Sequence, residues 1–215
     1  GLTMLYNLDI GQGIIASVLT TKQKNLRSKF DNVTSSAERD RLFRETLPES
    51  IALYITAIEA STGKIMFKEQ IIASYKSALS GKVVQLATGQ GKTIVAPCAT
   101  FSRVIAGQMG IVLTTKGESA EDGYKENKAA LALLGIKGGV AVADQQKATQ
   151  IYTIAKDNPM IIWGAIGDVA QHIRETIIGD NRVMPFKSDE EFTRLYLNFD
   201  EADSTMGIQA LTKFI

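Results

Sequence analysis

The sequence predicts an α/β fold, a parallel sheet flanked by helices, and three observations support this. Short apolar runs alternate with helical stretches from about residue 64 onward. A glycine-containing turn in "LATGQGKTIVA", residues 86–96, joins one apolar run to a helical stretch. Another apolar run ends in the acidic sequence "DEAD" at 200–203. Such alternation is typical of βαβ units, whose parallel strands are covered by helices on both faces.

Five strands and four helices are expected after residue 81. The strands are the apolar runs at 82–87, 110–115, 139–143, 160–164 and 194–199. The helices are expected at 92–107, 120–135, 144–155 and 168–178. Pro97 falls about one turn into the first of these helices, where a proline can bend the axis.

The N-terminal part predicts helices only. Ser35 precedes Glu38 by three residues, which is a capping-box signature for a helix start. The segment 47–60 predicts a second amphipathic helix, and 68–81 predicts a third that Gly81 can end. We therefore expect a short helical region over residues 1–46, followed by one α/β domain over 47–215.

Composition restricts the classes of function. The 215 residues are 45% hydrophobic and 22% charged, as in a globular protein. A net charge of +1 argues against a nucleic-acid-binding surface on global charge alone. Cys98 is the only cysteine, which fits a reducing compartment and a packing role. His172 is the only histidine, which argues against a metal site built from several histidines and against a serine–histidine hydrolase. Trp163 is expected in the core.

The segment "VVQLATGQGKT" has the order that a phosphate-binding loop requires: an apolar strand, a glycine turn, then Lys-Thr opening a helix. Gly89 and Gly91 let the backbone curl so that several N–H groups face one anion. Lys92 can reach the β- and γ-phosphates, and the Thr93 hydroxyl can bind Mg²⁺. The full pattern has a glycine or alanine where this chain has Leu86. The alternative is an ordinary turn at a helix N-terminus.

The acidic sequence supplies the second half of a nucleotide site. Asp200 at a strand tip can hold Mg²⁺ opposite Thr93, and Glu201 can orient or deprotonate an attacking water. Both motifs are expected at the carboxyl ends of parallel strands, where ligands bind. A solvated acidic turn is the alternative interpretation.

Together, "TGQGKT" and "DEAD" resemble the RecA-like ATPases of the DEAD class, and finer details resemble the SecA family, the motors of bacterial preprotein translocation. "FKEQ" at 67–70 is similar to the family's F-x-x-Q element, and "FDEADS" to V-D-E-V-D-S. The resemblance runs from about 46 to 204. It implies that Gln70 contacts the adenine and that Arg174 matches the arginine of the family's Y-L-R-D. It also implies a set of residues around the phosphates and metal: Thr88, Gly89, Gln90, Gly91, Lys92, Thr93, Asp200 and Glu201.

By this resemblance, the chain is the ATP-binding lobe of a motor that hydrolyses ATP with Mg²⁺ and acts on a polypeptide or a protein partner. The resemblance also implies a protein that is cytoplasmic or peripheral to a membrane, and export to another cell is left open. Because complete motors use a second RecA-like lobe, we expect a fragment with slow hydrolysis. Departures such as Glu121 in place of a family arginine leave the coupled substrate open. Two rival interpretations are a nucleic-acid helicase lobe and a non-enzymatic nucleotide-binding module.

Overall fold

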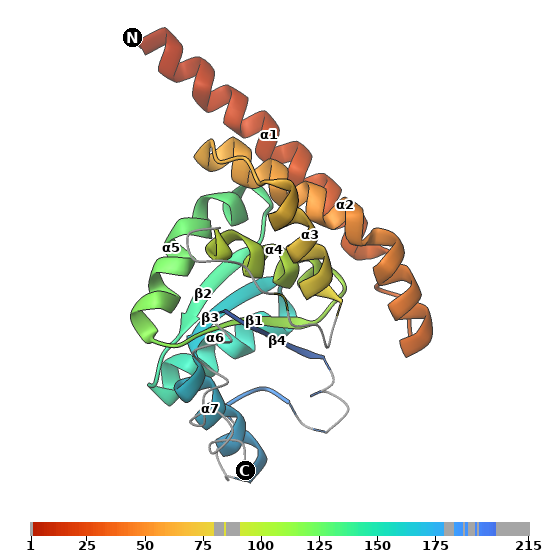
Figure 1. Cartoon of the computed structure of the whole chain (residues 1–215), viewed down its shortest axis with the longest axis vertical. Coiled ribbons are helices and arrows are strands. Elements are labelled where there is room, and N and C mark those ends of the chain that lie inside the picture. The colour runs from red at the N-terminus through yellow and green to blue at the C-terminus, as the bar shows by residue number, and fades with distance from the viewer. Residues whose placement is uncertain are drawn as a thin grey trace.

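The computed structural model describes residues 2–79, 84, 91–178, 183–186, 188, 192 and 194–200, with side chains from residue 11 onward. Within these residues four strands form one parallel sheet in the order β2-β3-β1-β4. The strands are β1 (Met109–Thr114), β2 (Lys137–Ala141), β3 (Met160–Ala165) and β4 (Leu195–Phe199). Helices cover both faces of the sheet (Figure 1), which confirms the predicted α/β class.

Each of these strands lies within two residues of its predicted position. β1 and β3 are buried along their whole length, as expected for central parallel strands covered on both faces. The predicted strand at 82–87 lies outside the described residues, except for residue 84.

The side chains of the strands alternate between two cores. Val112, Ile161 and Trp163 pack with helices α4 (Lys92–Ile105) and α5 (Gly117–Leu133). Ile111 and Ile162 point to the other face and pack with α6 (Gln145–Asp157) and α7 (Ile166–Ile178). Trp163 is 1% exposed, so its expected place in the core is confirmed.

The N-terminal part consists of long helices beside this domain (Figure 1). Helix α1 spans Leu2–Ser28 and helix α2 spans Ser36–Thr62. The two helices expected around Pro48 are therefore wrong as separate elements, because α2 continues through this proline. Burial of one face, including Leu47, Ile51 and Tyr54, offsets the hydrogen bond that Pro48 cannot donate.

The ends of α2 follow the sequence signals. The backbone N–H of Glu38 donates to Ser35 Oγ at 3.5 Å, and Gly63 ends the helix in the left-handed conformation with φ 70°. Helix α3 follows at Lys68–Ala78. Its expected terminator, Gly81, lies outside the described residues. In the part of the chain that is described, no helix is long and apolar enough to cross a membrane.

Candidate nucleotide site

The start of α4 is the centre of the candidate site. Gly91 precedes the helix with φ 74° and ψ 38°, a left-handed conformation that glycine adopts without strain. Lys92 is the first residue of α4, and Thr93 follows with an exposed side chain. The first turn carries no acidic side chain to offset the positive end of the helix dipole. This end of α4 therefore favours an anion.

Gln70 from α3 packs directly against Gly91. It is 7% exposed, and its Oε1 accepts a hydrogen bond of 2.8 Å from the backbone N–H of Phe67. A Cβ on Gly91 would collide with Gln70 Nε2. Gln70 is thus not a solvated helical residue; it adjoins the glycine of the predicted loop.

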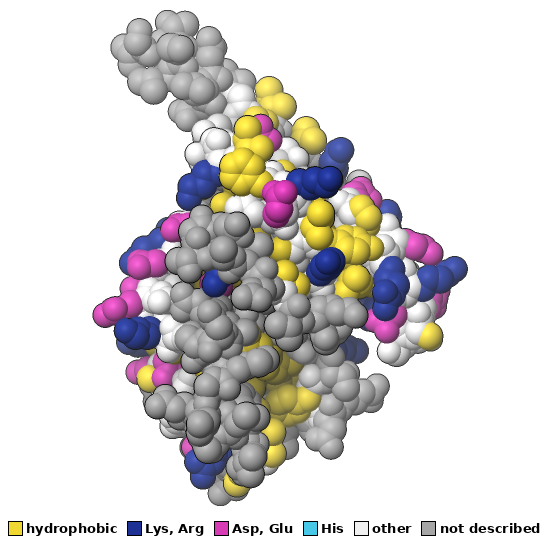
Figure 2. Space-filling model, in the orientation of Figure 1, with side chains coloured by type: hydrophobic (Ala, Val, Ile, Leu, Met, Phe, Trp, Pro, Cys, Tyr) yellow, Lys and Arg dark blue, Asp and Glu magenta, His cyan; other side chains and the backbone are white. Residues whose placement is uncertain are grey.

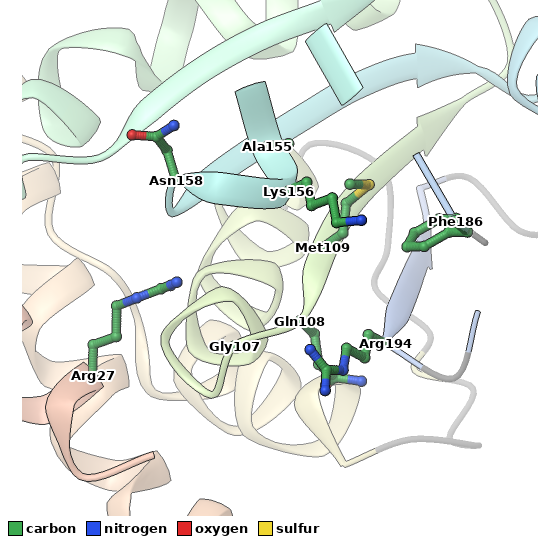
Figure 3. Close-up of a pocket in the computed structure, with 9 residues that line it drawn as sticks. All are labelled: Arg27, Gly107, Gln108, Met109, Ala155, Lys156, Asn158, Phe186 and Arg194. Carbon is green, nitrogen blue, oxygen red and sulfur yellow. The ribbon is translucent and has the colours of Figure 1, made fainter. Parts of the chain in front are cut away.

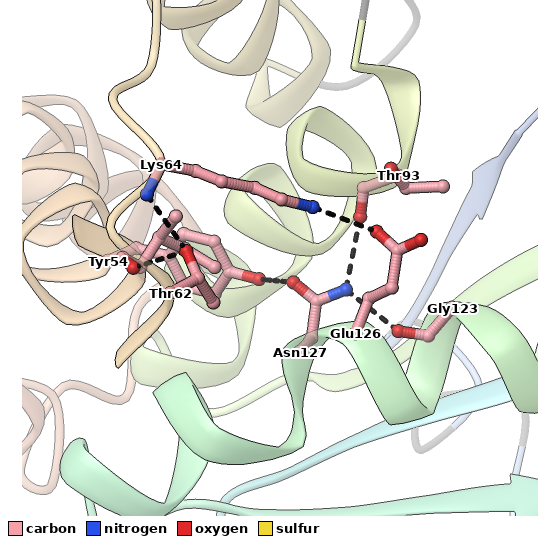
Figure 4. A network of polar contacts seen from close by, with 8 residues as sticks. Tyr54, Thr62, Lys64, Thr93, Gly123, Glu126 and Asn127 are labelled. Carbon is pink, nitrogen blue, oxygen red and sulfur yellow. Dashed lines mark hydrogen bonds and ion pairs between the residues drawn. The ribbon is translucent and has the colours of Figure 1, made fainter. Parts of the chain in front are cut away.

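A buried amide holds the first turn of α4 from the other side. Asn127 of α5 is fully buried, and its Nδ2 donates to the Thr93 carbonyl at 3.1 Å and to the Gly123 carbonyl at 2.8 Å. Its Oδ1 accepts a hydrogen bond from the Tyr54 hydroxyl of α2 (Figure 4). In an α-helix the Thr93 carbonyl would accept from residue 97, but Pro97 has no N–H. Asn127 supplies the missing donor.

The tip of β4 is tied to the same helix. Asn198 is 7% exposed, and its Nδ2 donates to the Ala96 carbonyl of α4 at 3.0 Å. The backbone N–H of Asp200 donates to the Leu113 carbonyl at 2.8 Å, which continues the ladder between β4 and β1 one residue beyond the strand. Because side chains alternate along a strand, Asp200 shares the α4 side of the sheet with Asn198.

The structure therefore places Gln70 beside Gly91, with Lys92 and Thr93 opening α4. Asp200 directly follows β4, whose Asn198 is hydrogen-bonded to Ala96 in the next turn of α4. The hydroxyl oxygen of Thr93 and the carboxylate of Asp200 are oxygen donors of the kind that Mg²⁺ prefers. The remaining predicted residues lie outside the described part of the chain: Thr88, Gly89, Gln90 and Glu201. Their roles stay predictions.

Comparison with known proteins gives this arrangement a family. The family model of the SecA DEAD-like domain matches residues 12–210, which is nearly the whole chain. The chain belongs to the SecA DEAD-like domain family. The expected RecA-like fold and the resemblance to SecA are thereby confirmed.

Similar proteins carry the same family name. The chain is 26% identical to the protein translocase subunit SecA of Prochlorococcus marinus over 92% of its own length. It is 27% identical to that of Clostridium novyi over 89%, and 24% identical to that of Pseudomonas putida over 99%. This SecA DEAD-like domain spans only 20% to 22% of the length of those relatives.

Asn127, Tyr54 and Asn198 of this SecA DEAD-like domain were not predicted as part of the site. Each lies in a helix or strand where the sequence shows only a periodic pattern of apolar residues. Pro97 was a usable signal, since a proline inside a helix leaves one carbonyl without its partner. The sequence does not show which distant side chain satisfies it.

Two other residues singled out in the sequence, His172 and Arg174, lie on α7. His172 is 1% exposed, and its Nδ1 lies 3.1 Å from the Tyr152 hydroxyl. Burial lowers the pKa of His172, partly opposed by a backbone hydrogen bond at Ala143 and by the charge of Asp168. Arg174 is exposed on α7.

Cys98 is fully buried within α4, in agreement with the packing role expected for it. Burial raises the pKa of its thiol to about 12, and a side-chain hydrogen bond with Ser74 opposes part of that rise. Burial likewise raises the pKa of the Tyr54 hydroxyl. The Cys98 thiol and the Tyr54 hydroxyl are therefore both neutral near pH 7.

Proposed function

We propose that this domain binds ATP with Mg²⁺ at the start of α4 and hydrolyses it slowly. The observation that carries the proposal is the hydrogen bond from Asn198 of β4 to the carbonyl of Ala96, one helical turn after Lys92 and Thr93 in α4. Asn198 joins β4 to the first half of α4, and Asp200 lies two residues farther along. Binding of phosphate and metal requires a cation where a loop enters a helix, together with a carboxylate at the end of a neighbouring strand.

In the proposed complex, each residue has one task. The α4 N-terminus and Lys92 neutralise the β- and γ-phosphates. Thr93 and Asp200 supply oxygen ligands for Mg²⁺, which would polarise the γ-phosphate. Glu201 takes a proton from the attacking water.

The base would lie toward α3. Gln70 offers an amide for the adenine edge, and Phe67, 69% exposed, is one turn away on the same side of the chain. Figure 2 shows hydrophobic side chains exposed on this face of the molecule, and Ile65, Ile72 and Tyr75 are among the exposed apolar residues near α3. An exposed aromatic ring suits stacking on a nucleobase.

Coupling to a polypeptide substrate is the wider proposal. The relatives are named protein translocase subunits, and this domain spans about a fifth of their length. We infer that ATP turnover is coupled to protein translocation or remodelling by parts corresponding to the rest of those proteins, including a second RecA-like lobe.

Calorimetry with Mg²⁺-ATP and Mg²⁺-ADP tests the binding step. We expect Lys92→Ala to weaken binding by about tenfold or more, because a charge-assisted contact to phosphate is lost. Lys128→Ala is the matched control, since Lys128 is an exposed lysine on α5. Equal affinities of the wild type and Lys92→Ala would contradict the site.

Phosphate release separates hydrolysis from binding. Glu201→Gln should keep nucleotide binding and abolish the slow turnover of the wild type. Binding without any turnover in the wild type would instead favour the non-enzymatic module. A rate near that of a complete motor would contradict the need for a second lobe.

A further inference from the structure

A buried amide near the end of β4 joins this strand to two helices. Asn198 is 7% exposed, and its Nδ2 donates to the Ala96 carbonyl of α4 at 3.0 Å and to the Thr100 hydroxyl at 3.4 Å. Its Oδ1 accepts a hydrogen bond of 3.5 Å from the Ser77 hydroxyl, at the end of α3. Both ends of one side chain are therefore used to connect β4 with α4 and α3.

Packing alone does not explain an amide at this position. Val112, its direct partner on β1, is apolar and belongs to the core beneath α4, as do Ile161 and Trp163. A leucine of similar size would fill the space without the cost of burying an amide. Hydrogen bonds have direction and apolar packing does not, so a satisfied buried amide specifies one arrangement of its partners. Asn198 therefore specifies where α4 lies along β4.

Strand β4 is itself fixed against β1 at both ends. At its start, the backbone N–H of Met109 donates to the Arg194 carbonyl at 2.9 Å, and Figure 3 shows both residues beside a hollow of about 70 Å³. At its end, the N–H of Asp200 donates to the Leu113 carbonyl at 2.8 Å. Because β4 cannot slide without breaking these bonds, the position of α4 on the sheet determines how far Thr93 lies from Asp200.

Two asparagine side chains from different elements hold the beginning of α4. Asn127 of α5 donates to the Thr93 carbonyl, and Asn198 donates to the carbonyl of Ala96, three residues later. Asn127 thus holds the backbone of one proposed metal ligand. Asn198 ties the strand that leads to the other ligand, Asp200, to the same helix.

The spacing of two ligands matters more for Mg²⁺ than for Ca²⁺. Mg²⁺ demands nearly ideal octahedral geometry with oxygens at about 2.0–2.1 Å, whereas Ca²⁺ accepts about six to eight oxygens at about 2.3–2.6 Å in a flexible arrangement. Residues that orient metal ligands without touching the metal typically change metal affinity by about 10–100-fold. A residue that fixes the spacing of the two ligands can therefore favour the smaller ion.

We propose that Asn198 is a positioning residue that makes the nucleotide site selective for Mg²⁺ over Ca²⁺, by fixing the spacing between Thr93 and Asp200. The inference rests on the proposed nucleotide site and adds a determinant of metal choice to it. Asn198 acts through the Ala96 carbonyl and the backbone of β4. Its loss should change the metal dependence of nucleotide binding and leave metal-free binding intact.

Calorimetry of ADP binding to the 215-residue chain measures this dependence, with saturating Mg²⁺, with saturating Ca²⁺ and with a chelator. Asn198→Leu replaces the amide by an apolar side chain of similar size. We expect the gain in ADP affinity caused by Mg²⁺ to fall about tenfold, and the gain caused by Ca²⁺ to fall by about threefold at most. The affinity of free ADP for each metal is common to all variants and cancels between them.

Ser50→Ala is the matched control. The Ser50 hydroxyl donates to Ser102 Oγ at 2.8 Å, a buried bond between α2 and the last turn of α4. Its loss should lower the urea concentration at the unfolding midpoint and leave the preference for Mg²⁺ unchanged. Asn198→Thr is a second variant in case Asn198→Leu does not fold. Threonine favours strands, and its hydroxyl ends one bond short of the asparagine nitrogen, so the same loss of preference is expected.

The outcomes separate this inference from the nucleotide site on which it rests. Equal gains from Mg²⁺ in the wild type and the folded Asn198 variants would overturn the inference and leave the site standing. A uniform loss of ADP affinity with Mg²⁺, Ca²⁺ and chelator would also overturn it, because a purely structural residue gives that pattern. The same loss of Mg²⁺ preference in Ser50→Ala would overturn it as well. A wild type that binds ADP equally with and without Mg²⁺ would contradict the metal site itself, and the inference with it.

Discussion

Asn127 donates a hydrogen bond of 3.1 Å from its side-chain amide to the backbone carbonyl of Thr93. This carbonyl would otherwise lack its helical partner, because position 97 is a proline. The bond joins α5 to the first turn of α4, and the Tyr54 hydroxyl extends the connection to α2. The residue proposed to hold Mg²⁺ is therefore positioned by a buried amide from another helix.

Asn127→Ala should lower the free energy of unfolding by about 2–3 kcal/mol, because the Thr93 carbonyl and the Tyr54 hydroxyl both lose a buried partner. Urea denaturation followed by circular dichroism measures this loss. Tyr54→Phe removes only the hydroxyl and should cost less.

Pro97→Ala provides a sharper test of the same bond. An alanine at position 97 restores an N–H that can reach the Thr93 carbonyl, so Asn127→Ala should cost about 1 kcal/mol less in that background. Strictly additive effects of the two substitutions would show that Asn127 does not compensate for the proline.

Gly91→Ala should destabilise the domain more than Gly63→Ala. Both glycines have a φ near 70°, so each alanine pays about 1 kcal/mol for the left-handed conformation. A Cβ on Gly63 meets open space, whereas one on Gly91 collides with Gln70. The Gln70 side chain cannot easily move away, because its Oε1 accepts a hydrogen bond from the N–H of Phe67.

Urea denaturation measures the free energy of unfolding of both variants. The collision with Gln70 should lower that of Gly91→Ala by about 1–3 kcal/mol more than that of Gly63→Ala. Gly91→Ala should cost less when combined with Gln70→Ala than it does alone. If Gly63→Ala and Gly91→Ala cost the same, the packing of Gln70 against the loop is not significant for stability.

Cys98 should react very slowly with thiol reagents in the folded protein. It is fully buried, and burial raises its pKa to about 12, so little thiolate exists at pH 8. We expect a rate about 10³-fold below that of the urea-unfolded chain. Because this is the only cysteine, the total thiol signal reports it directly. A rate within tenfold of the unfolded chain would contradict the buried placement.

The regular part of the fold was predictable because its signals are local. Apolar runs and capping residues placed β1, β3, β4 and α4 through α7 to within a few residues. Helix α2 was predicted as two helices, because the sequence does not show that burial against distant elements carries one helix through Pro48. The environment of the site was not predictable for the same reason. Asn127 and Thr93 are 34 residues apart, and their contact depends on how α5 packs against α4.

His172 should make stability depend on pH between about 5 and 7. Burial lowers its pKa in the folded state, whereas the unfolded value is about 6.5. The unfolded chain therefore binds more protons in this range, and stability falls as the pH drops below about 6.5. Above that pH both states are neutral at this residue, so its stabilising contribution is fully present.

Urea denaturation at several pH values tests this dependence against His172→Gln. The wild type should lose stability between pH 7 and 5 relative to the variant, with a slope of at most about 1.4 kcal/mol per pH unit. Since the chain has no other histidine, carboxylate titration at lower pH is common to both proteins and cancels in the difference. Tyr152→Phe removes the hydroxyl near Nδ1 but keeps the imidazole, so it should retain a pH slope. Parallel curves for the wild type and His172→Gln would mean that His172 titrates normally in the folded protein and is not held neutral by burial.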